Sequence, residues 1–204
     1  MNELWDIRVR TPRLELRLPT DDELEEFYRV AAAGIHPPED MPFAINWTDT
    51  LEHDSFVEFH RTAWREWRPE QWSCNFVTFL DGKPIGTQAV EATDFARDRT
   101  VGTGSWLGAP YQGKGYGTEQ RAAVLEFAFR GLGAQAAASG AITTTLASAR
   151  VSEKLGYRMT GVSQLAPRGE PVDHYNFRLE RSEWRCPIPV EIEGLEAARH
   201  LFGA

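Results

Sequence analysis

The chain has 204 residues, 42% of them hydrophobic and 25% charged, as in an ordinary soluble globular protein with one sizeable core. Its formal net charge of -8 argues against nucleic acid as a partner, because binding a phosphate backbone usually requires a basic excess. The sequence has no apolar run long enough to span a membrane, no apolar signal core and only two cysteines, so we expect a cytoplasmic protein.

The first part of the chain predicts one strand and two helices. Leucines alternate with charged residues through 10–20, which indicates a half-buried strand. Residues 21–34 begin with acidic side chains and end in glycine, as is typical of a helix. A proline-rich loop follows, and apolar residues at near-helical spacing then predict a second helix over 50–67.

The remaining part predicts strands interspersed with helices. Residues 72–80 and 84–92 flank the turn sequence Asp-Gly-Lys and should form a hairpin. The further expected elements are a strand over 99–107, a helix over 118–131, a strand over 134–142, a short helix over 148–156 and closing strands over 157–165 and 173–181. In the longer helix, one face carries the apolar residues Ala122, Leu125, Phe129 and Leu132. This order predicts a mixed sheet with helices on its faces.

Residues 108–119, GAPYQGKGYGTE, place three glycines at alternate positions before the longer helix. A dinucleotide fingerprint is rejected because Gly113, Gly115 and Gly117 are spaced one residue too tightly. A P-loop is rejected because Lys114 is followed by glycine, where serine or threonine should bind magnesium. Such glycines let successive N–H groups turn inward at the positive end of a helix, which makes a cradle for phosphate. The alternative is a turn without a ligand, but ordering three glycines costs much entropy.

Residues 112–117, QGKGYG, match the Q/R-x-x-G-x-G/A signature of the GNAT superfamily of acyl-CoA-dependent N-acyltransferases. The stretches TPRLELR, GSWLGAPYQGKGYGTE and ARVSEKLGY resemble the branch that includes the ribosomal-protein N-terminal acetyltransferases. This resemblance implies an acyltransferase domain over 8–182, with a C-terminal extension over 183–204 packed on or near it. It implies an α/β (α+β mixed) fold, with a mixed, mostly antiparallel central sheet of about seven strands, a V-shaped splay and helices on both faces.

The resemblance also implies how acetyl-CoA, the default co-substrate, would bind. The two splayed strands would be about 99–108 and 134–142, with Trp106 and Leu107 beside the pantetheine arm. The main chain before and at the helix start would bind the diphosphate, with added charge from Lys114. The residues concerned are Gln112, Gly113, Lys114, Gly115, Tyr116, Gly117 and Thr118. Further along, Thr145 and Ser148 would contact the coenzyme, although Thr145 replaces the asparagine of the family pattern.

Three groups are candidates for the chemistry that the resemblance implies. The N–H of Leu107 would polarise the thioester carbonyl. The position of the family's tyrosine acid is occupied by Ser152, so Ser148 is the candidate that protonates the leaving thiolate, with a purely structural role at the helix start as an equal interpretation. The position of the family's glutamate base is occupied by Gly102. His174 is then a candidate base, because histidine is the residue type that most often exchanges protons near neutral pH.

Several questions stay open at this point. Glu91, Asp94, Asp173, a water relay and bulk solvent are alternatives to His174. The implied reaction is direct transfer of an acetyl group to a primary amine in a ternary complex, without a metal; another acyl group such as succinyl, or a non-catalytic CoA-binding module, are alternatives. The acceptor is open among protein N-termini, lysine side chains, aminoglycosides and polyamines. The tail is expected to cover the acceptor groove or to form a contact in a homodimer.

Overall fold

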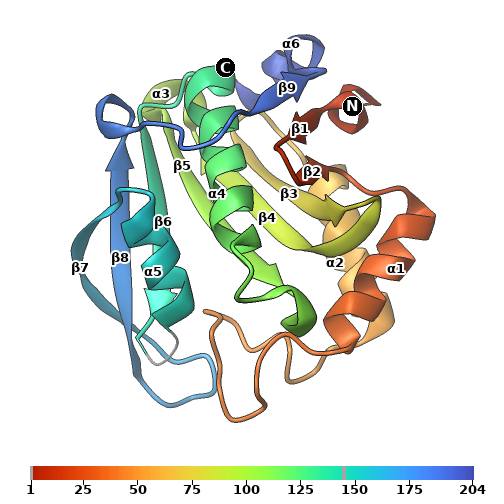
Figure 1. Cartoon of the computed structure of the whole chain (residues 1–204), viewed down its shortest axis with the longest axis vertical. Coiled ribbons are helices and arrows are strands. Elements are labelled where there is room, and N and C mark those ends of the chain that lie inside the picture. The colour runs from red at the N-terminus through yellow and green to blue at the C-terminus, as the bar shows by residue number, and fades with distance from the viewer. Residues whose placement is uncertain (1, 144–145) are drawn as a thin grey trace.

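The computed structural model describes residues 2–143 and 146–204, and in this part of the chain a nine-stranded sheet has the strand order β7-β8-β6-β5-β4-β3-β2-β1-β9 (Figure 1). The strands are β1 (Arg8–Arg10), β2 (Leu14–Arg17), β3 (Gln71–Leu80), β4 (Lys83–Thr93), β5 (Thr100–Leu107), β6 (Ala136–Ile142), β7 (Arg158–Leu165), β8 (Val172–Glu180) and β9 (Glu191–Glu193). The α-helices are α1 (Asp21–Ala32), α2 (His53–Arg65), α3 (Phe95–Asp98), α4 (Tyr116–Glu126), α5 (Leu146–Lys154) and α6 (Leu195–Ala198). None of the described helices is both long and apolar enough to cross a membrane.

The expected mixed, mostly antiparallel sheet is confirmed. β5 and β6 pair in parallel, and the other described pairs are antiparallel. The sheet has nine strands where about seven were expected, because β1 and β9 lengthen one edge. Each of these two has only three residues, too few for a period-2 pattern to identify. Strand β9 comes from the C-terminal segment, where Ile192 pairs with Val9.

The expected splay lies between β5 and β6. The two strands pair from Thr100 with Ala136 to Thr103 with Ser139. Beyond that point the described ladder ends, although β5 continues to Leu107 and β6 to Ile142. We call the space between these two strand ends the splay. Helices α4 and α5 lie on one face of the sheet and α2 on the other (Figure 1). The two faces of the sheet on either side of the splay are therefore covered by different helices.

Helix α4 is buried on more than the one face that its apolar residues predict. The expected apolar residues Ala122, Leu125, Phe129 and Leu132 are all buried, and the polar side chains Glu119, Gln120 and Arg121 are buried as well. Each of these polar side chains has partners on a neighbouring segment: Gln120, for example, accepts a hydrogen bond from Thr78 at 2.9 Å. The helix is longer than expected at its start, and it ends in a π-helical turn over Phe127–Leu132.

Helix α1 begins in a capping box. Thr20 Oγ1 accepts from the N–H of Glu23 at 3.3 Å, and the Glu23 carboxylate accepts from the N–H of Thr20 at 2.8 Å. Arg17 donates to the same carboxylate at 2.7 Å. This hydrogen bond from Arg17 is the main reason that the pKa of Glu23 falls from its ordinary value of 4.5 to about 2.

The C-terminal segment packs against two tryptophans near β3. Trp67 Nε1 donates to the carbonyl of Leu201 at 2.8 Å, and Trp72 Nε1 donates to that of Phe202 at 3.1 Å. The Phe202 ring is fully buried, at 5.1 Å from the ring of Trp67 and 5.7 Å from that of Phe127. The segment therefore contributes both a strand and a core side chain.

Candidate active site

The glycine loop, residues 112–117, connects the end of β5 to α4 through left-handed backbone. Gly113 has φ of +73° and Gly115 has φ of +85°, conformations that side chains with a Cβ rarely adopt. Gly117 has no such requirement, and a Cβ there would make ordinary contacts with Leu107 at 3.8 Å and Val151 at 3.9 Å. The local sequence is therefore needed for backbone shape at two of the three glycines.

The start of α4 presents a run of unbonded main-chain donors. Glu119 is the first residue of α4 with a recorded backbone acceptor, the carbonyl of Gly115 at 3.1 Å. Among the described residues, no backbone hydrogen bond is recorded for the N–H groups of 113–118. The N–H of Gln112 is already bonded to the carbonyl of Ala109 at 3.3 Å, so the available donors begin at Gly113. Unbonded donors at a helix N-terminus are the usual site for a phosphate group.

The side chain of Gln112 has a structural role instead. Its amide Nε2 donates to the carbonyl of Ile35 at 2.6 Å and to that of Leu107 at 2.7 Å. It thereby joins the glycine loop to the end of β5 and to the segment after α1. These two hydrogen bonds fix the glycine loop beside the splay.

Arg13 is a site residue that the sequence did not identify. Its guanidinium donates to the buried Glu119 carboxylate at 2.6 Å and to the carbonyl of Lys114 at 3.2 Å, and it lies 4.5 Å from the ring centroid of Tyr116. The charge of Arg13 is thus paired with that of Glu119 beside the loop, next to the exposed Lys114. Arg13 belongs to the quoted stretch TPRLELR, but that stretch and the loop lie about 100 residues apart, so their contact was not visible in the sequence.

The end of β5 directs Leu107 and Trp106 to different places. Gly108 donates its N–H to Ile85 of β4 at 2.9 Å, and because ladder groups alternate in direction, the N–H of Leu107 points away from β4 into the splay. The Trp106 ring stacks on Phe27 of α1 at 4.9 Å and lies 5.9 Å from Trp47. The main chain of β5 therefore faces the splay while its tryptophan joins an aromatic cluster.

Ser148 lies beside the end of β6 that no longer pairs with β5. Its hydroxyl donates to the carbonyl of Gly140 at 3.4 Å from the first turn of α5. Ser152, at the position of the family's tyrosine, is fully buried, and its hydroxyl has no partner among the described residues. Thr145, the other residue expected here, lies outside the described residues.

His174 lies over the sheet at the place where the two strands part. A Cβ built on Gly140 would come within 2.2 Å of His174 Nε2, so the imidazole occupies the space that a side chain there would fill. Its Nδ1 is 3.5 Å from Ser163 Oγ on β7. Ser139 points toward α4, so Gly140 and His174 lie on the opposite face. The imidazole therefore reaches the splay from the side away from α4.

Glu91 lies on that same opposite face. It pairs with Gly102 across β4 and β5, and a Cβ built on Gly102 would lie 3.2 Å from Glu91 Oε1. The carboxylate is thus next to the position where the family's glutamate would be attached. Asp94 follows the far end of β4 and forms an ion pair with Arg97 at 3.3 Å, so the structure does not bring it to the splay. Asp173 is exposed.

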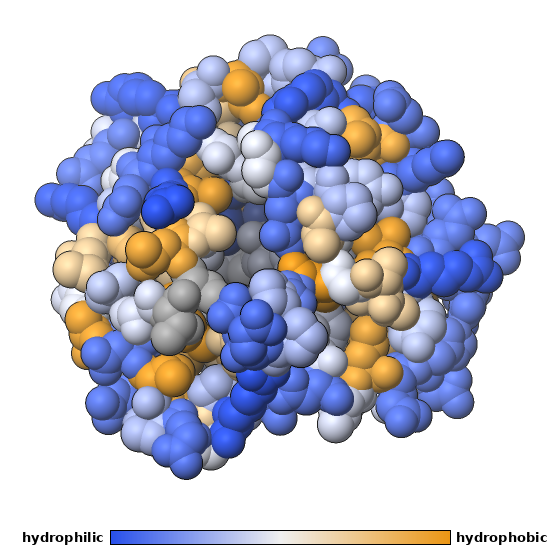
Figure 2. Space-filling view, turned by 60° about the horizontal axis from the view of Figure 1, so that its bottom comes forward, coloured by the Kyte–Doolittle hydropathy of each residue, from blue (hydrophilic) through white to orange (hydrophobic). Residues whose placement is uncertain are grey.

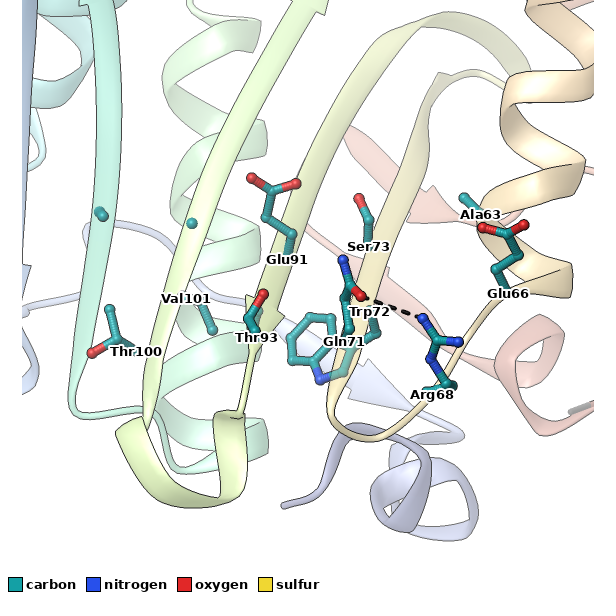
Figure 3. A pocket seen from close by; sticks show the side chains of 13 residues that line it. Ala63, Glu66, Arg68, Gln71, Trp72, Ser73, Glu91, Thr93, Thr100 and Val101 are labelled. Carbon is teal, nitrogen blue, oxygen red and sulfur yellow. Dashed lines mark hydrogen bonds between the residues drawn. The ribbon is translucent and has the colours of Figure 1, made fainter.

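A cavity of about 490 Å³ adjoins Gly102 on this face and is lined by residues from α2 and from strands β3 to β6 (Figure 3). Its ionisable lining groups are Glu66, Arg68 and Glu91. Seen from the end where the loops gather, the surface is hollowed near its centre, between hydrophilic and hydrophobic residues (Figure 2). Arg168, in the turn between β7 and β8, pairs there with Asp49 of the loop before α2 at 2.6 Å.

A sheet that splays beside a helix N-terminus with free donors is the architecture of an acyl-CoA-binding transferase. The model of the acetyltransferase (GNAT) domain matches residues 13–158, and the chain belongs to this family.

Solved structures share the fold. An acetyltransferase of the GNAT family from Bacillus anthracis has a TM-score of 0.69 at 18% identity, covering 86% of this chain and 99% of that one. The ribosomal alpha-N-protein acetyltransferase RimL in complex with coenzyme A has a TM-score of 0.70 at 13% identity, covering 83% and 95%. The microcin self-immunity acetyltransferase MccE in complex with acetyl-CoA and AMP has a TM-score of 0.66 at 18% identity, covering 83% and 93%.

Proposed function

We propose that the protein transfers an acetyl group from acetyl-CoA to a primary amine, directly and within a ternary complex. The observation that carries this proposal is the parting of β5 and β6 beside the unbonded donors of the glycine loop. A phosphate-binding helix start lies on one face of the sheet, and a partly acidic cavity lies on the other, beside the last paired residues of β5 and β6. A donor and an acceptor can therefore approach from opposite sides of the sheet.

The residues present fit coenzyme A. The N–H groups of 113–118 bind the diphosphate, Lys114 adds positive charge, and Arg13, paired with Glu119, holds the loop in place. The pantetheine arm follows the main chain at the end of β5, where the N–H of Leu107 points into the splay. Acetyl-CoA supplies an already activated thioester, so holding the amine beside it contributes roughly 7–11 kcal/mol through proximity.

The protein's own groups handle the charge and the protons. The N–H of Leu107 stabilises negative charge on the thioester oxygen while the nitrogen–carbon bond forms and the carbon–sulfur bond breaks. Ser148, on the α5 side of the splay, gives a proton to the departing sulfur and regains one from solvent. On the opposite face, His174 takes the proton that the attacking amine loses, and Glu91 is the alternative acceptor.

The acceptor in this proposal is a cationic amine, because two carboxylates and one guanidinium line the cavity. RimL is named for a ribosomal protein and MccE for self-immunity to microcin C7. The two structures therefore do not indicate one acceptor for this chain. An amine panel should therefore include an N-terminal peptide, a lysine peptide, a polyamine and an aminoglycoside.

Two measurements test the proposal. Calorimetry with coenzyme A should give 1:1 binding, and a free-thiol assay with acetyl-CoA should give amine-dependent release with at least one member of the panel. Release with succinyl-CoA but not acetyl-CoA would assign a different donor. Tight binding without release for any amine or donor would indicate a coenzyme-binding module and contradict the enzyme.

A further inference from the structure

Arg121 is a buried cation that the proposed mechanism does not use. It lies on α4, is 2% exposed and is among the largest fully buried side chains in the described chain. Its Nε donates to Gln88 Oε1 of β4 at 3.2 Å, its Nη2 to Ser105 Oγ of β5 at 3.0 Å and its Nη1 to Ser139 Oγ of β6 at 2.8 Å. One guanidinium therefore joins three neighbouring strands.

All three of these acceptors are neutral. No recorded ion pair in the described residues includes Arg121, and the titratable group that interacts with it is the buried Tyr157 phenol, which lies 3.2 Å from Thr103 Oγ1. Burial lowers the pKa of Arg121, but a guanidinium stays protonated in proteins. A buried charge without an anion is costly, and an apolar side chain of similar volume usually serves packing as well or better. Packing alone does not explain an arginine here.

The position of the guanidinium coincides with the point where the sheet divides. Ser139 is the last residue of β6 that pairs with β5, whereas Ser105 lies two residues beyond Thr103, the last residue of β5 that pairs with β6. Gln88, which accepts from Arg121, also donates to the carbonyl of Gly104 at 3.0 Å. Arg121 is thus bonded to both branches of the splay at its base.

The same position puts a positive charge near the reacting atoms. Ser105 is two residues before Leu107, roughly 7 Å along the strand. The charge lies on the α4 side of the sheet, where the glycine loop also lies. Because no protein carboxylate neutralises it, the negative charge that it can stabilise is the one that develops on the acyl oxygen and sulfur during transfer.

We propose that Arg121 is a positioning residue for acyl transfer, which fixes the separation of β5 and β6 and provides an unneutralised positive charge at the base of the splay. This role rests on the proposed function. Its effect belongs to the transition state, since the resting diphosphate is bound by the glycine loop and not by Arg121.

The test compares three variants by calorimetry with coenzyme A and by steady-state thiol release. Arg121→Met should lower kcat about tenfold or more while the Kd for coenzyme A changes less than about threefold. Arg121→Lys keeps the charge without the planar fork and should recover part of kcat. Arg130→Met removes an exposed arginine from the turn after α4 and should leave both quantities unchanged.

The kinetic results for these variants either support or contradict the role of Arg121. Equal kcat for wild type and a folded Arg121→Met variant would overturn the role of Arg121 alone. If Arg121→Met does not fold, Ser105→Ala replaces it, with a several-fold loss of kcat expected and an unchanged kcat contradicting the role. If wild type binds coenzyme A but transfers to no amine, the proposed function fails first and this role fails with it.

Discussion

At the scale of single residues, replacing Gly115 has two effects, backbone strain and damage to the proposed diphosphate site, and a second glycine allows them to be distinguished. A Cβ at φ of +85° is strained wherever it occurs, and here it would also lie 3.4 Å from Arg13 Nη2. Gly169, in the turn between β7 and β8, has φ of +87° and open space around it. The two glycines therefore form a matched pair that differs mainly in location.

We expect Gly115→Ala to weaken coenzyme A binding about tenfold, which corresponds to about 1.4 kcal/mol. The reason is that relief of the strain turns the N–H groups of the loop away from the diphosphate. Both Gly115→Ala and Gly169→Ala should lower the free energy of unfolding by about 1 kcal/mol, but Gly169→Ala should leave the affinity for coenzyme A unchanged. Calorimetry and thermal melting of both variants check this, and equal affinity for coenzyme A in both would remove the glycine loop from the site.

Single substitutions also identify which side chain accepts the proton of the attacking amine. If His174 takes the amine proton, His174→Ala should lower kcat about 100-fold at neutral pH, whereas Glu91→Gln should change it less than about threefold. Steady-state kinetics with the best amine of the panel measures both. The reverse ranking would assign the proton to Glu91, and two small effects would favour bulk solvent.

Single residues also show the limit of the sequence analysis. The signature in 112–117 was sufficient to place the loop, because backbone shape there depends on local glycines. Arg13 was missed because its role comes from a contact with Glu119 that only the folded chain makes. Arg121 was missed because a helical pattern reports apolar residues and not a buried arginine with partners on three strands.

At the scale of elements, the start of α1 depends on pH. The pKa of Glu23 is lowered to about 2 in the folded chain, chiefly by Arg17, so its contribution to stability is complete above its ordinary value of 4.5. The contribution is lost as the pH falls through about 2. The side chain of Glu23 is 23% exposed, so solvent screens the interaction only in part.

We expect Glu23→Gln to lower the free energy of unfolding by about 1–2 kcal/mol at pH 7, because the amide loses the charged hydrogen bond. At pH 3 the difference from wild type should be less than half of that. Urea unfolding at the two pH values measures it. Glu26→Gln, an exposed position on the same helix, is the control, and an equal pH dependence in both variants would contradict the assignment.

Elements with strong periodicity agreed with the sequence. The hairpin of β3 and β4, the helices α1 and α2 and the closing strands were all expected within a few residues of their bounds. The boundaries of α4 differed because its first residues, Tyr116 and Gly117, belong to the signature and not to an apolar pattern. Strands β1 and β9 were not expected, since each has only three residues and the partner of β9 comes from the opposite end of the chain.

At the scale of the whole molecule, the C-terminal segment completes the core. Phe202 is fully buried among Trp67, Trp72 and Phe127. Phe202→Ala should therefore lower the free energy of unfolding by about 3–5 kcal/mol. Phe59→Ala, at a position that is 61% exposed, should change it by less than about 0.5 kcal/mol. Denaturant unfolding checks both, and a small effect at Phe202 would show that the segment is only loosely attached.

The pairing of β1 with β9 also has a practical consequence. It brings the two ends of the described chain to one pole of the molecule, while the glycine loop lies at the other pole (Figure 1). A handle fused to either terminus, or a short linker that joins them, is therefore remote from the glycine loop that would bind the coenzyme. Attached to a sensor surface by such a handle, the protein would present its coenzyme-binding pole to the flowing solution.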